Sequence, residues 1–262
     1  MPIGVGERIR QWDDFAEPTA RLAQSCAANM LDALAALAKN RPAIELGAGA
    51  GRVCIPLARR GVSVTAAEFS PEMIRHLREA AVREAVSNLE ILQCDFSSLP
   101  ADKRYGLAYC IDNAFFALCS EEEQLRCFRS VANLLDENGF FVIEAGAPTP
   151  AHLEAGARIV YAGPSGTIVE RFKPHGVSTI SLITEITTEN AGENAQAARF
   201  WTLAHYYIPV TKFDEYASKS TMTLAARWSD WSEAPYDGNP WRHISVWRRE
   251  VPRSARASLS TR

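Results

Sequence analysis

Three glycines at alternate positions are the first residues in this sequence whose spacing points to chemistry. Gly47, Gly49 and Gly51 lie between the short apolar run 43–46 and a helical pattern over residues 53–60. Alternate glycines let the backbone come close to a bulky ligand, and the amide groups at the start of a helix point toward that ligand. The pattern therefore predicts a strand, a loop and a helix that together bind a nucleoside cofactor.

The residue after the third glycine separates two kinds of cofactor. A loop that binds a dinucleotide has the pattern G-x-G-x-x-G, in which the third glycine packs the helix against the strand. Arg52 stands where that glycine belongs. This substitution disfavours a nicotinamide cofactor, although a glycine-rich turn between a strand and a helix is also found as a tight turn without a ligand.

Two acids follow later strands at positions that suit a nucleoside. Glu68 ends the apolar run 62–67, about 20 residues beyond the glycines, where a carboxylate accepts two hydrogen bonds from a ribose diol. Asp95 directly follows the run 89–94. The alternative interpretations are a solvated loop acid for Glu68 and a turn or helix cap for Asp95.

The segment 45–52, Glu-Leu-Gly-Ala-Gly-Ala-Gly-Arg, resembles motif I of the class I S-adenosylmethionine-dependent methyltransferases. The resemblance covers residues 12–147 and is closest to small-molecule enzymes, including those that act on amino sugars and other natural products. Ala48 and Ala50 replace residues that are often Cys or Thr in the family, a change that leaves a backbone site intact. The other stretches that carry the resemblance are 109–118, 122–128 and 138–145.

The resemblance implies S-adenosyl-L-methionine as the cofactor and S-adenosyl-L-homocysteine as its product. In the family, the loop wraps the methionine half, an acid in the place of Glu45 lies near the ammonium group, and an acid in the place of Asp95 accepts a hydrogen bond from the adenine amino group. Trp12 and Phe15 occupy the region where family members often carry a tyrosine. The expected cofactor-binding residues are Glu45, Gly47, Gly49, Gly51, Arg52, Glu68, Phe69, Asp95, Phe96 and Cys110.

Methyl transfer from a sulfonium needs little chemical help from side chains, because the leaving group is already activated by its charge. The protein mainly aligns the acceptor and excludes water, and it supplies a base only where the acceptor must lose a proton. We therefore expect neither a catalytic triad nor a metal. The candidate catalytic residues are Asp112, His205 and His243, and the candidate substrate-binding residues are Asn113, Phe115, Phe116, Tyr206 and Trp231.

The acceptor candidates come from two regions of the chain. Asp112 and Asn113 follow the fourth strand, and open α/β sheets bind their ligands beyond the carboxyl ends of the strands. Most of the tryptophans lie after residue 200, and such a density of aromatic rings suits a flat or cationic acceptor. Alternation within 200–207 also fits rings that pack a sheet, and Phe115 or Phe116 also fits the core of the next helix. Neither histidine has a spacing argument behind it.

Alternating strands and helices must position these residues. An amphipathic helix is expected over 18–39; Ser70-Pro71 and Ser120 should begin two more helices, the second of which should end at Asn138-Gly139. The expected strands up to Pro148 are 43–46, 62–67, 89–94, 107–111 and 140–144. Beyond it, strands are expected at 159–161, 167–173, 177–188, 198–209, 222–228 and 244–248, with a helix over 211–218.

This order of elements predicts an α/β fold, with a doubly wound, mostly parallel seven-stranded sheet of the Rossmann-like methyltransferase type and an antiparallel β insert after the fifth strand. Residues 1–150 should form the cofactor-binding core. Residues 151–209 should form an insert that covers the substrate or contacts another subunit. Residues 210–250 should return to the core sheet, and 251–262 should be a disordered polar tail.

The composition of the chain limits the classes of partner that it is expected to bind. The formal charge of −3 provides no overall positive field to attract nucleic acid or anionic lipid, so a small molecule is the expected partner. No run reaches the roughly 18 apolar residues that cross a bilayer, and the six cysteines show no CxxC spacing. We therefore expect a cytoplasmic protein with reduced thiols, either a monomer or a homodimer.

The sequence thus predicts an enzyme that moves a methyl group to an N or O atom of a small-molecule acceptor, in secondary metabolism. Two alternatives stay open at this point: a nicotinamide-dependent oxidoreductase, and a non-catalytic protein that keeps the cofactor pocket for regulation. A nucleic-acid methyltransferase is a weaker alternative, because the fourth strand lacks the Pro-Pro-aromatic signature of the resembling amino-group enzymes and no basic groove is evident.

Overall fold

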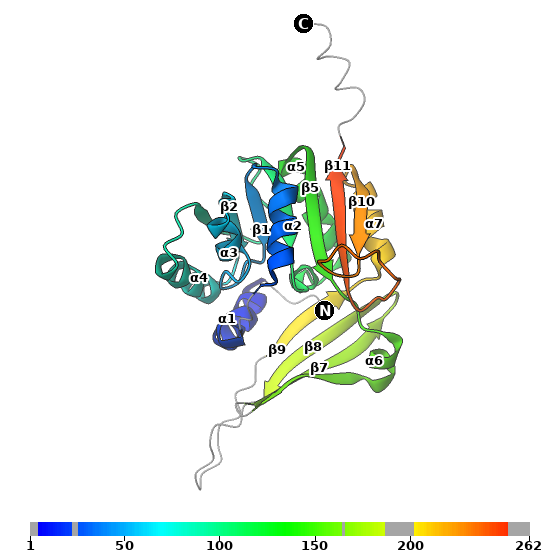
Figure 1. The fold of residues 1–262 in the computed structure, drawn as a ribbon. Coiled ribbons are helices and arrows are strands. Elements are labelled where there is room, and N and C mark those ends of the chain that lie inside the picture. Colours follow the sequence, from blue (N-terminus) through cyan, green and yellow to red (C-terminus); the bar gives the residue numbers. More distant parts are fainter. Residues whose placement is uncertain (1–4, 23–25, 164–165, 187–201, 251–262) are drawn as a thin grey trace, which may run out of the picture.

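A seven-stranded sheet forms the centre of the computed structural model, which describes residues 5–22, 26–163, 166–186 and 202–250. The strand order is β10-β11-β5-β4-β1-β2-β3 (Figure 1). β11 runs antiparallel to both neighbours and the other pairs are parallel, so the predicted fold class is confirmed. The strands are β1 (Ala43–Leu46), β2 (Val64–Glu68), β3 (Leu89–Gln93), β4 (Tyr105–Cys110), β5 (Leu135–Ala145), β10 (Met222–Trp228) and β11 (His243–Arg249).

Helices on both faces explain why the central strands are continuous apolar runs. Every residue of β1, β2 and β4 is buried, as expected for parallel strands covered on two sides. In Figure 1, α2 crosses the near face of the sheet, and α5 and α7 lie behind it. The helices of this layer structure are α2 (Ala28–Ala38), α3 (Cys54–Arg59), α4 (Pro71–Arg83), α5 (Glu121–Leu134) and α7 (Val210–Ser218).

Two helices begin where the sequence predicts. The Ser70 hydroxyl accepts a hydrogen bond of 3.1 Å from the Met73 amide at the start of α4, and Pro71 occupies the first turn. The Ser120 hydroxyl accepts one of 3.2 Å from the Glu123 amide at the start of α5. Both caps are confirmed.

The single helix predicted over residues 18–39 is wrong. The structure has two helices there, α1 (Val5–Leu22) and α2, and Ala27 before α2 has an extended backbone. Cys26, before the start of α2, has a thiol that donates a 2.8 Å hydrogen bond to the Arg52 carbonyl, beside the glycine loop. The helical periodicity of the sequence therefore runs across a boundary between two helices.

The helix end predicted at Asn138-Gly139 is also wrong. α5 ends at Leu134, and β5 begins at the next residue. Asn138 has φ +59°, and the pairing of β4 with β5 shifts register beside it. The Asn-Gly pair forms an irregularity near the start of a strand. A residue with positive φ is found both at the end of a helix and at a bulge in a strand, so the sequence pattern fits both.

A second, antiparallel sheet lies beyond the carboxyl ends of the first sheet's parallel strands (Figure 1). Its order is β6-β7-β8-β9, and β9 packs against α1 and against the short helix η1 (Ala114–Ala117). The structure adds one helix that was not expected, α6 (Pro150–Ala155), capped by Thr149. The four strands are β6 (Ala157–Gly163), β7 (Gly166–His175), β8 (Ser178–Ile186) and β9 (Thr202–Tyr207).

Parts of some predicted elements lie outside the described residues. These are the end of the strand 177–188, the start of the strand 198–209, and the tail 251–262. Within the described ranges, the helix predicted over 211–218 and the strands predicted over 222–228 and 244–248 are confirmed as α7, β10 and β11. No helix in these ranges is both long enough and apolar enough to cross a membrane.

Candidate functional site

The glycine loop joins β1 to α3 and has a backbone that side chains would distort. Gly49 has φ +54° and Gly51 has φ +95°, both in the left-handed region. A Cβ atom on Gly51 would lie 2.5 Å from the Leu77 side chain and 2.6 Å from that of Ile55. The third glycine therefore lets the loop pack against α3 and α4, and the first lets it pass close to Ala114, which would lie 3.0 Å from a Cβ on Gly47.

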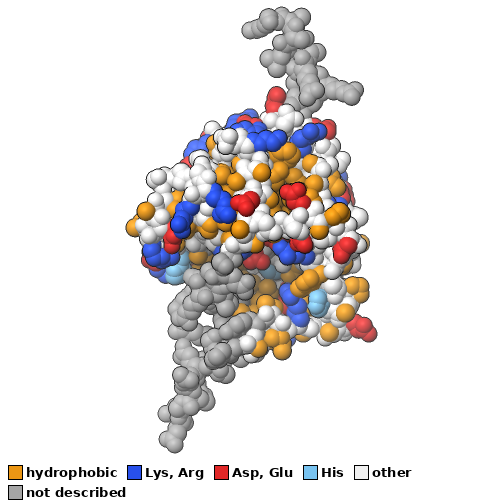
Figure 2. Space-filling view, in the orientation of Figure 1, with side chains coloured by type: hydrophobic (Ala, Val, Ile, Leu, Met, Phe, Trp, Pro, Cys, Tyr) orange, Lys and Arg blue, Asp and Glu red, His pale blue; other side chains and the backbone are white. Residues whose placement is uncertain are grey.

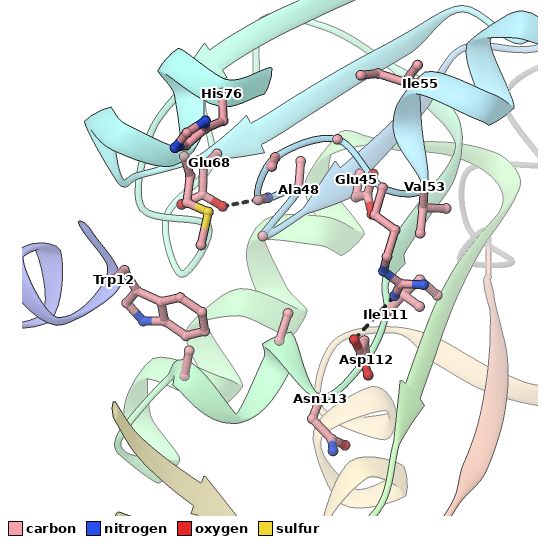
Figure 3. A pocket seen from close by; sticks show the side chains of 18 of the residues that line it. Trp12, Glu45, Ala48, Val53, Ile55, Glu68, His76, Ile111, Asp112 and Asn113 are labelled. Atoms are coloured by element: carbon pink, nitrogen blue, oxygen red, sulfur yellow. Dashed lines mark hydrogen bonds and ion pairs between the residues drawn. The ribbon is translucent and has the colours of Figure 1, made fainter. Parts of the chain in front are cut away.

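Glu68, at the end of β2, holds this loop in place. Its carboxylate accepts a hydrogen bond of 2.9 Å from the Gly49 amide (Figure 3). It also accepts 2.8 Å and 2.9 Å hydrogen bonds from the Phe69 and Ser70 amides. Burial raises the pKa of Glu68, and the three amides oppose that rise. A carboxylate has about four acceptor positions, so one is left for a ligand. The bracing of the loop is a role that the sequence reasoning missed.

Glu45, at the end of β1, is an almost wholly buried acid. Burial raises its pKa to about 8, against the effect of the Arg52 charge. Tyr109 donates a hydrogen bond of 3.3 Å to Glu45 Oε2. Arg52 forms an ion pair of 3.3 Å with Asp112, drawn as a dashed line in Figure 3. A cation that entered beside Glu45 would restore its charge, so this corner suits an ammonium group.

The other end of the site lies under α1. Asp95 accepts a hydrogen bond of 2.8 Å from the Ser97 amide and forms an ion pair of 3.4 Å with Arg8. Arg8 also forms an ion pair of 3.0 Å with Glu123. Phe69 and Phe96 lie in the same place, and with Arg8 and Asp95 they line a small void of about 10 Å³. The sequence reasoning missed Arg8. Its partners are 87 and 115 residues away, so no local pattern announces it.

A cavity of about 1010 Å³ connects these groups to the second sheet. On the cofactor side it is lined by Glu45, Glu68 and the glycine loop. Trp12 of α1 extends toward the same space (Figure 3). The opposite wall comes from the second sheet and from the end of β4, with Arg158, Ile183, Leu203, His205, Tyr207, Asp112 and Asn113. The side chain of Phe15 is not described.

The second sheet brings a buried set of polar groups to this wall. His205 Nδ1 lies 3.2 Å from the Tyr207 hydroxyl, which donates a 2.7 Å hydrogen bond to Glu170. Glu170 also accepts a hydrogen bond of 2.6 Å from the Ser181 hydroxyl and forms an ion pair of 2.7 Å with Arg158. Of the three candidate catalytic residues, His205 and Asp112 line the cavity. The remaining members of this set lie on strands that the sequence reasoning treated only as a cover.

Several predicted residues do not reach the cavity. His243 is buried between the Phe213 ring and the Ser245 hydroxyl, and burial lowers its pKa to about 4. Phe115 and Phe116 pack in an aromatic cluster around Phe213. Cys110, Tyr206 and Trp231 are buried in the two hydrophobic cores, as are the two phenylalanines.

The predicted cofactor residues other than Cys110 are brought together. Glu45, the three glycines, Arg52, Glu68, Phe69 and Phe96 line the large cavity, and Asp95 lines the small void beside it. Asn113 also lines the cavity. Its side-chain oxygen accepts a hydrogen bond of 2.8 Å from the Gly146 amide. Within the described part of the chain, no three His, Cys, Asp or Glu side chains group as a metal site would.

Comparisons with known proteins agree with this geometry. Residues 43–139 match a family model described as a methyltransferase domain. The chain is similar to the CcbJ methyltransferase from Streptomyces caelestis, with 25% identity and a TM-score of 0.77 over 92% of this chain and 98% of that one. No curated protein sequence matches.

Two further structures share the fold at lower identity. CalS10, an amino pentose methyltransferase from Micromonospora echinaspora, has 17% identity and a TM-score of 0.60 over 95% of this chain and 98% of that one. The sugar N-methyltransferase KedS8 from Streptoalloteichus sp ATCC 53650 has 14% identity and a TM-score of 0.60 over 95% and 90%. At such identities the likeness shows the fold alone.

Proposed function

We propose that the chain is an S-adenosylmethionine-dependent methyltransferase that moves a methyl group to an N or O atom of a small-molecule acceptor in secondary metabolism. The observation that carries the proposal is one cavity of about 1010 Å³ bounded by the glycine loop with Glu68 on one side and by His205 on the other. Ligand pockets commonly measure about 300–1,000 Å³, so this one has room for a cofactor and an acceptor together.

The residues present fit S-adenosyl-L-methionine. Glu45 is a buried acid poised to regain its charge beside an ammonium group, and Glu68 keeps an acceptor position at the place where a ribose diol would bind. The Phe69 and Phe96 rings, which line the large cavity, would hold the adenine, and Asp95 lies beside them. When bound, the cofactor would supply a methyl group on a sulfonium: the acceptor's lone pair would bond to the methyl carbon as the carbon–sulfur bond breaks, and the electron pair of that bond would stay on sulfur.

The chain's own residues then have three tasks. Trp12, Ile183 and Leu203 supply apolar walls that exclude water and orient the acceptor. His205 would take the acceptor's proton, since it lines the cavity and burial lowers its pKa, which keeps the imidazole neutral. Asp112 lines the same wall and is paired with Arg52, so we assign it to orientation of the acceptor. His243, within the core, has no such access.

Charge and neighbouring folds support a small acceptor. On the face shown in Figure 2, acidic and basic side chains are interspersed, and the net charge is −3, which does not favour a nucleic acid. Of the proteins that share the fold, CalS10 is an amino pentose methyltransferase involved in calicheamicin biosynthesis and KedS8 is a sugar N-methyltransferase, which makes amino sugars and hydroxylated sugars the first acceptors to test. All six cysteines are free thiols, which suits the cytoplasm.

Two experiments test the proposal. Calorimetry should show binding of S-adenosyl-L-methionine and of S-adenosyl-L-homocysteine to the purified protein, and none of a nicotinamide dinucleotide. Transfer of a labelled methyl group should then be measured across a panel of amino sugars, hydroxylated sugars and small peptides. Cofactor binding without transfer to any acceptor would favour the non-catalytic alternative. Binding of the dinucleotide in place of the sulfonium compound would overturn the assignment.

A further inference from the structure

One buried carboxylate organises the polar groups of the second sheet. Glu170 on β7 has a side chain with 0% exposure. Its Oε1 accepts from Ser181 on β8 at 2.6 Å and from Tyr207 on β9 at 2.7 Å, and its Oε2 pairs with Arg158 on β6 at 2.7 Å. All four strands of the sheet therefore meet at this residue.

The direction of these hydrogen bonds fixes a proton on His205. An ionised carboxylate only accepts, so the Tyr207 hydroxyl must donate its hydrogen to Glu170. The oxygen of Tyr207 is then left as an acceptor for the group 3.2 Å away, His205 Nδ1, which must carry a hydrogen. The second ring nitrogen, Nε2, has no hydrogen-bond partner among the described residues, and it belongs to a ring that lines the cavity.

Glu170 has the charge that this arrangement requires. Burial opposes its ionisation, but the hydrogen bonds from Ser181 and Tyr207 and the charge of Arg158 act against burial, and the pKa of Glu170 is lowered. The groups that act on the charge of His205 are Glu170 and Asp112, which favour the protonated ring, and Arg158, which disfavours it. An ionised Glu170 therefore stabilises the imidazolium that proton uptake creates.

We infer that Glu170, acting through Tyr207, is a positioning residue that keeps His205 protonated at Nδ1 and presents the lone pair of Nε2 to the acceptor. During transfer, the acceptor's proton moves to Nε2 as the acceptor atom bonds the methyl carbon, and His205 later returns it to water. The role of His205 as a base in methyl transfer rests on the proposed function. The tautomer itself is a property of the protein without ligands.

A purely structural role for the cluster is the competing explanation, because Glu170 also ties the strands of the sheet together. The two explanations differ in what they expect from Ser181 and Tyr207. Each residue contributes one hydroxyl to the same oxygen of Glu170, but only Tyr207 also contacts His205. Ser181→Ala is therefore a matched control for Tyr207→Phe.

The experiment is nuclear magnetic resonance of the unliganded full chain labelled with ¹⁵N in its histidine rings. The chain has five histidines, and a His205→Asn variant identifies the signals of His205. Long-range proton–nitrogen spectra report which ring nitrogen carries hydrogen. In the wild type, we expect His205 to be predominantly in the Nδ1–H form. Tyr207→Phe should shift the ring toward the Nε2–H form, and Ser181→Ala should not.

A titration of the same samples tests the part played by charge. Glu170→Gln removes the negative charge that favours the imidazolium, so it should lower the pKa of His205 further. If this variant does not fold, the Tyr207→Phe and Ser181→Ala pair still decides the question. A wild-type ring in the Nε2–H form, or equal effects of the two hydroxyl deletions, would overturn the inference. Neither result would touch the proposed function, which depends on cofactor binding and methyl transfer.

Discussion

The Gly49 amide donates a 2.9 Å hydrogen bond to Glu68 Oε2, which joins the middle of the glycine loop to the end of the neighbouring strand. The acid that a nucleoside needs at the end of β2 is therefore also the acid that shapes the loop at the end of β1. A change at Glu68 should affect the cofactor in two ways, through the lost ligand contact and through the loosened loop.

Glu68→Ala is expected to weaken binding of S-adenosyl-L-homocysteine by tenfold or more, which corresponds to about 1.4 kcal/mol or above. Calorimetry on the folded variant measures the change. The control is Glu90→Ala, which removes a carboxylate that pairs with Lys103 on the surface and does not line the cavity. Equal affinities of wild type and Glu68→Ala would remove Glu68 from the cofactor site.

Gly51→Ala is expected to destabilise the fold more than Gly61→Ala. Both glycines have positive φ, +95° and +88°, so both substitutions carry the same backbone strain of about 1–2 kcal/mol. Only at Gly51 would the new Cβ overlap side chains, 2.5 Å from Leu77, which adds about 1–3 kcal/mol. Urea unfolding of the two variants measures the difference. Equal losses would show that the loop moves away from α4 at no cost.

Local patterns predicted the parts of this site that local physics determines. The apolar runs predicted β1 and β2, the positions of Glu45 and Glu68 followed from the ends of these strands, and Ser70 capped α4 because the bonded Met73 amide is only three residues away. These features depend on neighbours in the chain or on the regular geometry of a parallel sheet.

The rest depends on contacts between distant residues. Arg8 reaches Asp95 and Glu123 across 87 and 115 positions, and the pairing of His205 with Glu170 through Tyr207 exists only once three strands are aligned. His205 and His243 were equivalent candidates in the sequence, since neither has a spacing argument behind it. The structure separates them because β9 faces the cavity, whereas β11 lies between two strands of the main sheet.

His205→Asn is expected to lower the rate constant of methyl transfer by about 100- to 10,000-fold, the usual contribution of a general base, and to leave cofactor affinity unchanged. The control is His175→Asn, because His175 is exposed and does not line the cavity. A wild-type rate for His205→Asn, with the acceptor identified in the panel, would show that this acceptor needs no base from the chain.

The same assignment predicts the pH dependence of the wild-type enzyme. Burial, partly opposed by Glu170 and Asp112, lowers the pKa of His205 below the ordinary value of about 6.5. At pH values above about 6.5 the imidazole is therefore neutral and able to accept a proton. The rate of methyl transfer should fall only at pH values below this. A rate profile whose acidic limb begins well above pH 7 would point to a different base.

Glu45→Gln is expected to change how stability depends on pH. Burial raises the pKa of Glu45 to about 8 in the folded chain, from an ordinary value near 4.5, so between these values the folded state binds the proton more tightly than the unfolded state. Stability must then fall as the pH rises through this window and level off above it.

Glutamine keeps the shape of the protonated acid and has no charge to bury. The variant should therefore match the wild type near pH 4 and exceed it at pH 8 by at least about 1.4 kcal/mol, the value of one pKa unit. Urea unfolding at both pH values measures the difference, with Glu90→Gln as the surface control. Parallel stability curves for wild type and Glu45→Gln would mean that Glu45 is ionised in the folded protein without a cofactor, and that its charge is already balanced by Arg52.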